Sequence, residues 1–286
     1  MSNNIEIIDV SKSFGDFELK DISFDIPKGR IVGLIGENGA GKSTLIKLIL
    51  GLLSYEKGKI TLFDNDNKNI NRRIFENIGV VLDDCSLPEN LNVIRIEKVM
   101  NKIYSQWSKE IYFELINRMK LPKNKKIKEF SKGMKMKLSI IIALSHCPKL
   151  LILDEATSGL DPIIRDEILD LFLDFVQDDG NSILVSSHIT SDLEKVADYI
   201  AFINNGELQF FESKDELIYN YAVIKCKSGS ISFIDEADII SCRKVDYGYQ
   251  VLVRNKEKMI KKYNEFVVDN VSIDDIMLIY VKGGMK

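Results

Sequence analysis

The chain has 286 residues, of which 45% are hydrophobic and 29% charged, and this balance is typical of a folded globular protein. The formal net charge of -4 gives no indication of the basic domain that is typical of nucleic-acid binding, so no nucleic-acid partner is expected. The four cysteines form no CxxC pair, which favours free thiols in a reducing compartment. The N-terminus does not resemble a signal peptide, and no apolar run approaches the ~20 residues of a membrane-spanning helix, so we expect a soluble, cytoplasmic chain.

The first part of the chain predicts strands followed by a strand–turn–helix unit. Alternating apolar and polar residues over 5–10 and 17–26 predict two strands of an antiparallel edge. A short apolar run over 31–35 predicts a buried strand, and apolar residues at helical spacing over 42–53 predict a helix. A glycine-rich turn separates the last two elements, and this order is typical of an anion-binding loop.

Residues 87–147 are expected to form a helical subdomain. Apolar residues recur at three- and four-residue spacing over 93–104 and over 110–119, which predicts two amphipathic helices. Pro122 and the lysines after it indicate a loop. A further helix is expected from Lys135 onward.

Strands and helices alternate beyond this segment. Short apolar runs over 150–153 and 183–185 predict two buried strands, and the residues after each strand predict helices over 162–177 and near Asp192. This alternation predicts an α/β fold whose sheet is mostly parallel and covered by helices.

The sequence pattern changes after about Asn220. Two-residue alternation over 247–254 predicts a strand, and Ser272 is a candidate cap for a last helix. We therefore expect a main domain over residues 1–219 and a small C-terminal α+β region over residues 220–286.

Residues 36–43 read GENGAGKS, which fits the phosphate-loop pattern G-x-x-x-x-G-K-S/T without a mismatch. The glycines let the backbone curl so that its amides point at phosphate oxygens, and the next helix adds its free N-terminal amides. Lys42 would place a charge beside the β- and γ-phosphates, and the Ser43 hydroxyl suits a Mg²⁺ ion. The predicted ATP-binding residues are Gly36, Asn38, Gly39, Ala40, Gly41, Lys42, Ser43 and Thr44.

Two acidic residues end the apolar run at 150–153. Asp154 and Glu155 stand at the carboxyl end of a predicted parallel strand, where open α/β sheets bind their ligands. Adjacent strand residues face opposite ways, so the two carboxylates can take different roles. We predict that Asp154 holds Mg²⁺ and that Glu155 polarises the attacking water. The alternative is a pair of solvated acids, which the upstream phosphate loop makes less favourable.

Further motifs follow in a fixed order. FSKGM at 130–134 stands between the phosphate loop and the acidic pair, SGLD at 158–161 follows that pair, and His188 follows a predicted strand. Over about residues 1–215 the set resembles the nucleotide-binding subunits of ATP-binding cassette (ABC) transporters. The resemblance implies a P-loop NTPase with a mostly parallel sheet, an antiparallel β edge subdomain and a helical subdomain, to which the chain adds its C-terminal α+β appendage.

The resemblance implies roles for individual residues of these motifs. The segment 130–134 is similar to the family's signature sequence, usually LSGGQ, and 158–161 to its D-loop. In the family both act on ATP that is held by a second ATPase chain, and the residues implied here are Ser131, Lys132, Gly133, Met134 and Asp161. Ser131 and Asp161 are also candidate N-caps of helices, and both functions can hold.

His188 and Phe14 stand where the family contacts the nucleotide. The resemblance implies that His188 hydrogen-bonds the γ-phosphate and orients the attacking water, which gives a catalytic set of Lys42, Glu155 and His188. It also implies that Phe14 stacks on adenine, with packing against the edge sheet as the alternative.

The chain departs from the family pattern at three positions. Asp83 stands where the family has a glutamine after the third apolar strand, and we predict it as a Mg²⁺ ligand, with Asp84 as a substitute. In the signature, Lys132 replaces a glycine and Met134 replaces the glutamine. Lys132 either contacts a phosphate across the dimer or faces solvent. These departures suggest slower or differently coupled hydrolysis.

The resemblance implies that the chain powers a transporter with ATP and Mg²⁺. It would pair with itself or with a paralogous ATPase on the cytoplasmic face of the cell membrane, and it would contact an integral membrane subunit through residues 83–92. The sequence FSKGMKMKL at 130–138, together with the C-terminal region, resembles a sub-branch of exporters with separate ATPase and membrane chains. That sub-branch includes bacterial exporters of antimicrobial peptides and phenol-soluble modulins. A lipid or drug exporter ATPase and a nucleotide-sensing subunit with little turnover are the alternatives.

Overall fold

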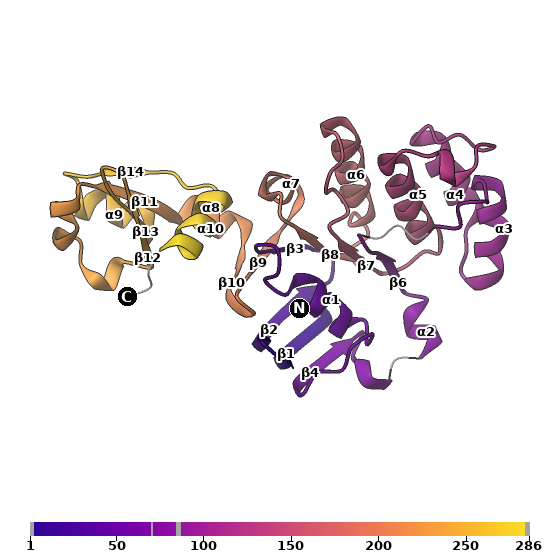
Figure 1. The fold of residues 1–286 in the computed structure, drawn as a ribbon, viewed down its shortest axis with the longest axis horizontal. Coiled ribbons are helices and arrows are strands. Elements are labelled where there is room, and N and C mark those ends of the chain that lie inside the picture. Colours follow the sequence, from indigo (N-terminus) through magenta and orange to yellow (C-terminus); the bar gives the residue numbers. More distant parts are fainter. Residues whose placement is uncertain (1–2, 70, 84–86, 284–286) are drawn as a thin grey trace.

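Two β-sheets with their covering helices make up the chain (Figure 1). The computed structural model describes residues 3–69, 71–83 and 87–283. The helical segment and the smaller sheet lie at opposite ends of the larger sheet (Figure 1). Within the described ranges, no helix combines the length and the apolar character that crossing a membrane requires.

The larger sheet contains ten strands, which are β1 (Asn3–Phe14), β2 (Phe17–Pro27), β3 (Ile31–Ile35), β4 (Lys57–Leu62), β5 (Asn65–Asp66), β6 (Ile78–Val81), β7 (Leu150–Asp154), β8 (Ser182–Ser187), β9 (Tyr199–Asn204) and β10 (Glu207–Ser213). The smaller sheet contains β11 (Tyr221–Cys226), β12 (Ser241–Val245), β13 (Gly248–Arg254) and β14 (Val267–Asp269). The helices are α1 (Lys42–Ile49), α2 (Arg72–Phe75), α3 (Val93–Ile103), α4 (Lys109–Arg118), α5 (Lys132–Ser145), α6 (Pro162–Phe175), α7 (Thr190–Val196), α8 (Lys214–Asn220), α9 (Lys256–Lys262) and α10 (Ile273–Lys282).

The larger sheet combines an antiparallel edge with a parallel centre. Its strands follow the order β5-β4-β1-β2-β10-β9-β3-β8-β7-β6. The strands β1, β2, β4 and β5 pair antiparallel, whereas β9, β3, β8, β7 and β6 run parallel. The predicted α/β class, with a parallel core and an antiparallel edge, is confirmed.

The parallel strands are buried on both faces, as their continuous apolar sequences predict. Every residue of β3, β7 and β8 is buried. Along β3, Val32 and Leu34 belong to an apolar core shared with α1, whereas Ile31 and Ile35 belong to a second core shared with α5, α6 and α7. Burial of each such side chain contributes about 1.5–3 kcal/mol, so the two cores hold the strand ends in place.

The helices α3, α4 and α5 form the segment that was predicted as helical over 87–147. The helix α5 begins at Lys132, so the predicted start at Lys135 is wrong by three residues. The reason is local: the Ser131 hydroxyl accepts a hydrogen bond from the amide of Met134 (3.2 Å) and caps the helix there.

Residues 221–269 contain an antiparallel sheet with the strand order β12-β13-β11-β14. The last helix, α10, begins after the predicted cap Ser272, whose hydroxyl and amide both bond to Asp275 in a capping box. Apolar residues of α10 join the same core as the central sheet. The predicted boundary between residues 219 and 220 falls at the end of α8, and it stays a prediction.

His146 is a buried histidine at the end of α5. Its ring stacks on Tyr104 with 4.2 Å between ring centroids, and its Nε2 lies 3.2 Å from the carbonyl oxygen of Ile78. Burial lowers the pKa of His146 below its usual value. The unfolded chain therefore takes up a proton near pH ~6.5, while the folded chain does so only at lower pH. The stability that this histidine contributes is complete above the pKa of the unfolded chain, and it is lost as the pH falls from there towards the lower pKa of the folded chain.

We expect a His146→Gln variant to show a weaker pH dependence of stability than the parent chain. Between about pH 7.5 and about pH 5.5 the parent loses the contribution of His146, because the unfolded state binds the extra proton. Glutamine keeps hydrogen-bonding groups but does not titrate in this range. Urea unfolding of both chains at the two pH values measures the difference, and equal losses of unfolding free energy would contradict the assignment.

Candidate functional site

Four neighbouring parallel strands end at one edge of the larger sheet. Ile35 of β3 lies opposite Ser187 of β8, Leu153 of β7 lies opposite Val185 of β8, and Val81 of β6 lies opposite Leu153. The segments that leave this edge carry the predicted site residues: the loop 36–41, His188, Asp154 with Glu155, and Asp83. Ligands of parallel α/β sheets bind outside this edge.

The loop between β3 and α1 has a backbone that can surround a phosphate. Gly39 and Gly41 have φ angles of +85° and +113°, a region that favours glycine. Gly36 has no room for a side chain, because a Cβ there would lie 2.3 Å from the carbonyl oxygen of Ile203. Gly41 is the N-cap residue of α1, and none of the described side chains caps this helix end. Its first amides therefore remain available to an anion.

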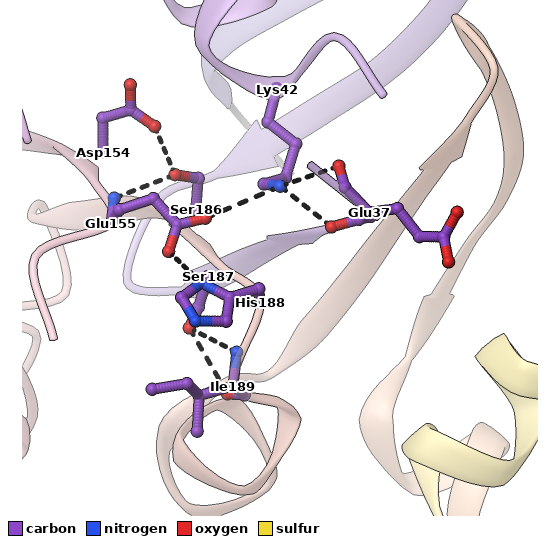
Figure 2. Close-up of polar contacts among 9 residues, drawn as sticks. Glu37, Lys42, Asp154, Glu155, Ser186, Ser187, His188 and Ile189 are labelled. Carbon is purple, nitrogen blue, oxygen red and sulfur yellow. Dashed lines mark hydrogen bonds and ion pairs between the residues drawn. The ribbon is translucent and has the colours of Figure 1, made fainter. Parts of the chain in front are cut away.

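The Lys42 ammonium lies against this loop (Figure 2). The side chain is only 6% exposed, and its Nζ donates to the carbonyl oxygens of Gly36 (2.8 Å) and Glu37 (3.2 Å). It also lies 3.5 Å from Oε1 of Glu155. A buried ammonium requires such partners. A single positive charge thus stands between the phosphate loop and the acidic pair.

Glu155 connects Lys42 to His188 (Figure 2). Its Oε2 lies 2.5 Å from Nδ1 of His188, while its Oε1 faces Lys42. Oε1 is buried and has no hydrogen-bond partner among the residues that the structure describes. The backbone of Glu155 has a φ of +53°, which is uncommon for a residue other than glycine and recurs at functional sites. A carboxylate fixed in this way is suited to accept a proton.

Ser186 holds the second carboxylate, and sequence reasoning missed this residue. Its hydroxyl donates to Oδ1 of Asp154 (2.5 Å) and accepts from the amide of Glu155 (3.0 Å). Asp154 is buried. The available signal was a pair of serines, Ser186 and Ser187, at the end of an otherwise apolar strand. Ser186 therefore fixes the orientation of the acidic pair from the neighbouring strand.

The turn between β9 and β10 supports the phosphate loop. The amide of Gly206 donates to the carbonyl oxygen of Ala40 (3.1 Å). Gly206 has a φ of +77°, and a Cβ there would lie 1.8 Å from the carbonyl oxygen of Glu18. Only glycine fits this contact, so the turn packs directly on the loop and on β2.

A hollow of about 390 Å³ lies between this turn and the phosphate loop, and its lining residues are Asp16, Phe17, Glu18, Lys20, Gly39, Asn205 and Glu207. Phe14, the predicted adenine-stacking residue, lies at the end of β1 and is 41% exposed. The hollow is lined by Phe17, which sequence reasoning did not single out. The stacking of Phe14 on adenine stays a prediction.

Comparison with known proteins identifies the family. A family model described as ABC transporter matches residues 19–158. The lantibiotic transport ATP-binding protein SrtF of Streptococcus pyogenes is 38% identical over 207 residues, which cover 71% of this chain and 88% of that protein. The chain belongs to the ABC transporter family.

Two further comparisons agree with this assignment. The bacitracin transport ATP-binding protein BcrA of Enterococcus faecalis is 33% identical over 207 residues, which cover 71% of this chain and 67% of that protein. A solved ATP-binding subunit of an ABC transporter aligns with a TM-score of 0.67 and 28% identity, over 74% of this chain and 91% of that one. The predictions of a P-loop fold, of ATP binding and of ATP hydrolysis are confirmed.

The signature residues of this ABC ATPase begin α5. Ser131 caps the helix, and a Cβ on Gly133 would lie 2.6 Å from Cδ1 of Ile164, so glycine lets α5 approach α6. Lys132 is exposed, and its Nζ lies 3.1 Å from the position of a Cβ on Gly159 in the D-loop of the same chain. Its contact with a phosphate of a second chain stays a prediction.

The D-loop residue Asp161 caps α6. Its carboxylate accepts a hydrogen bond from the amide of Ile164 (3.0 Å), and Pro162 follows at the first helical position. Both structural alternatives, the caps at Ser131 and Asp161, are therefore confirmed. The roles of Asp161 and of the half-buried Met134 towards a second chain stay predictions.

The remaining predicted ligands lie around the loop and the sheet edge. Asn38 and Ser43 are exposed and Thr44 is half-buried, in the loop and the first turn of α1. Asp83 is exposed and lies two residues beyond β6, at the same sheet edge as Asp154. Its role as a Mg²⁺ ligand stays a prediction. Its predicted substitute, Asp84, lies outside the described residues.

Proposed function

We propose that this chain is the ATP-hydrolysing subunit of a bacterial exporter whose cargo is an antimicrobial peptide. The observation that best supports ATP hydrolysis is the contact of Glu155 with both Lys42 and His188, because it joins the phosphate loop to groups that activate water. The cargo class is supported by two relatives whose names describe transport of a lantibiotic and of bacitracin. Lipid or drug export and nucleotide sensing with little turnover are the alternatives.

Three side chains would carry out hydrolysis. The phosphates of ATP would lie against the loop 36–41 and the start of α1, with Lys42 beside the β- and γ-phosphates. Glu155 would accept the proton of the attacking water. His188, bonded to Oε2, would hold the carboxylate and contact the γ-phosphate; its side chain is 44% exposed and can reach a group outside the sheet edge.

The residues present fit a Mg²⁺ ion. Mg²⁺ takes oxygen ligands and is typically bound by one or two carboxylates together with phosphate oxygens and water. The Asp154 carboxylate, fixed by Ser186 at one oxygen, and the Ser43 hydroxyl at the start of α1 would hold it, with Asp83 as a further ligand. When bound, Mg²⁺ supplies charge neutralisation at the β- and γ-phosphates.

A second ATPase chain, identical or paralogous, would complete the site. Ser131–Met134 and Asp161 of one chain would face the loop 36–44 of the other and enclose ATP between them. The position of Ser131 at the start of α5 supports this arrangement, because the N-terminus of a long helix attracts phosphate charge. ATP bound at both faces stabilises the closed dimer, and hydrolysis releases it.

An integral membrane subunit would place the chain on the cytoplasmic face of the membrane. Its contact surface would be residues 83–92, of which the structure describes 83 and 87–92. Glu89 in this segment lies 3.1 Å from Nζ of Lys135 in α5. A movement of the segment would therefore reach the helix that the signature residues begin.

The test is ATP hydrolysis by the purified chain, measured against protein concentration with Mg²⁺ present. We expect the rate to rise more steeply than linearly, because two chains form each site. With the membrane subunit co-purified in vesicles, a lantibiotic should stimulate the rate and a lipid or a small drug should not.

The Asp83→Gln variant in the same assay should hydrolyse ATP faster than the parent chain, because the shorter carboxylate is expected to slow turnover. An unchanged rate would contradict this expectation.

Other outcomes would favour the alternatives. A rate strictly proportional to concentration would contradict the two-chain site. If only a lipid or a drug stimulates the hydrolysis rate, then that compound, and not a peptide, is the cargo. ATP binding without hydrolysis, both alone and with the membrane subunit, would identify a nucleotide-sensing subunit.

A further inference from the structure

The helix α7 begins two residues after His188. Ile189 stands between them, and its amide donates to the Ser187 hydroxyl (2.9 Å). None of the described side chains caps α7, and a helix of seven residues is too short to be stable by itself. Contacts on the sides of α7 must therefore fix it, and the same contacts fix the backbone from which His188 projects.

The helix α7 packs both on the central sheet and on α10 of the C-terminal region. Leu193 is fully buried, and its Cδ1 lies 2.8 Å from the position of a Cβ on Gly33 in β3. The α10 residues Ile273 and Ile276 are fully buried in the same core. The helix next to the catalytic histidine thus lies between the ATPase sheet and α10.

Glu194 of α7 makes two polar contacts with this C-terminal side. Its Oε1 accepts a hydrogen bond from the amide of Ile273, the first residue of α10 (2.9 Å). Its carbonyl oxygen accepts from Nζ of Lys214 at the start of α8 (2.8 Å). A carboxylate at a helix N-terminus is stabilised by the helix dipole, and the capping box of Ser272 and Asp275 fixes the direction of that N-terminus.

The opposite side of α7 is fixed to the D-loop helix. Asp192, buried in α7, lies 2.9 Å from the guanidinium of Arg165 in α6. The helix α6 is the one that Asp161 caps. Buried or partly buried side chains thus hold α7 on three sides, through Leu193 on β3, Asp192 on α6 and Glu194 on α10. Loss of the α10 anchor would loosen the helix whose first residue stands two positions after His188.

We propose that Glu194 is a positioning residue for ATP hydrolysis, and that it acts by anchoring α7, and with it His188, on the C-terminal region. The proposal rests on the role given above to His188. Glu194 contacts neither the phosphate loop nor the acidic pair among the contacts described here, so its loss should lower kcat and leave the KM for ATP unchanged. The loss of one such hydrogen bond corresponds to about a fivefold change in the population of the active arrangement.

The experiment compares Glu194→Ala and Glu194→Gln in the full chain. Alanine removes the acceptor for the Ile273 amide, whereas glutamine keeps an oxygen at the same place. The matched control is Lys195→Ala on the same helix, because the Lys195 pair with Asp166 is exposed on both sides and contributes little. Rates are measured well below the lowest Tm, and hydrogen exchange is followed at the amides of α7.

We expect kcat to fall about fivefold in Glu194→Ala and to recover in Glu194→Gln, with faster amide exchange in α7 only for alanine. An unchanged kcat in Glu194→Ala, or an equal loss in Glu194→Gln, would overturn the proposal. If the parent chain hydrolyses no ATP, both alone and with the membrane subunit, the proposed function fails instead. In that case the rate of amide exchange in α7 alone tests whether Glu194 anchors the helix. Equal exchange rates in the parent and in Glu194→Ala would overturn the proposal.

Discussion

Replacing Glu155 with glutamine is expected to stop ATP hydrolysis while ATP binding persists. Glutamine has the shape of glutamate and can keep its contact with His188, but its amide cannot accept a proton from water. A positioned general base contributes about 10²–10⁴-fold, so we expect kcat to fall about 10³-fold. Phosphate release at saturating MgATP measures the loss, and titration with a fluorescent ATP analogue measures the binding.

The matched control for this variant is Glu114→Gln, the same change at an exposed position of α4. It should keep the parent rate. If Glu155→Gln binds ATP but cannot use it, closed dimers should accumulate with ATP and elute earlier on size-exclusion chromatography. Hydrolysis within tenfold of the parent would mean that a group other than Glu155 accepts the proton.

The parts of the site that depend on local sequence could be predicted. The apolar run of β3 and the glycines before Lys42 lie within twelve residues, and each has one local cause: continuous burial for the strand and positive φ for Gly39 and Gly41. The acidic pair was predicted for the same reason, since Asp154 and Glu155 end an apolar run. Family resemblance added His188, which no local pattern distinguishes from a structural histidine.

The contacts that assemble these parts depend on residues far apart in the sequence. Glu155 and His188 are 33 positions apart, and Ser186 is 32 positions from the Asp154 carboxylate that it holds. Their contact requires the register between β7 and β8, which hydrophobic patterns alone do not give. The contact of Glu194 with the amide of Ile273 spans 79 positions and depends on how the second sheet packs, so no sequence pattern could have indicated it.

One missed feature did leave a local signal. Asn205 and Gly206 form the turn between β9 and β10, and an Asn-Gly pair between two apolar runs is a strong indicator of a hairpin. The hairpin could therefore have been predicted. Its contact with the carbonyl oxygen of Ala40 could not, because that contact depends on the sheet order that places β10 beside β2.

Replacing Lys42 with alanine is expected to weaken ATP binding and to stop hydrolysis. The ammonium is buried between the loop carbonyls and Glu155, where its charge would meet the phosphates. Removal of one charged donor from such a site costs about 10²–10³-fold in kcat. ATP affinity should fall at least about tenfold, which corresponds to about 1.4 kcal/mol. The same two assays, of phosphate release and of nucleotide binding, measure both effects.

The matched control is Lys47→Ala, because Lys47 lies on the same helix but is exposed in its last turn. Lys47→Ala should keep both the ATP affinity and the hydrolysis rate of the parent chain. This result would show that the position of the Lys42 charge matters, and not the net charge of α1. Unchanged ATP affinity in Lys42→Ala would mean that the ammonium serves the loop carbonyls and Glu155 as a structural ion pair. Phosphate would then be bound by the loop amides and the start of α1 alone.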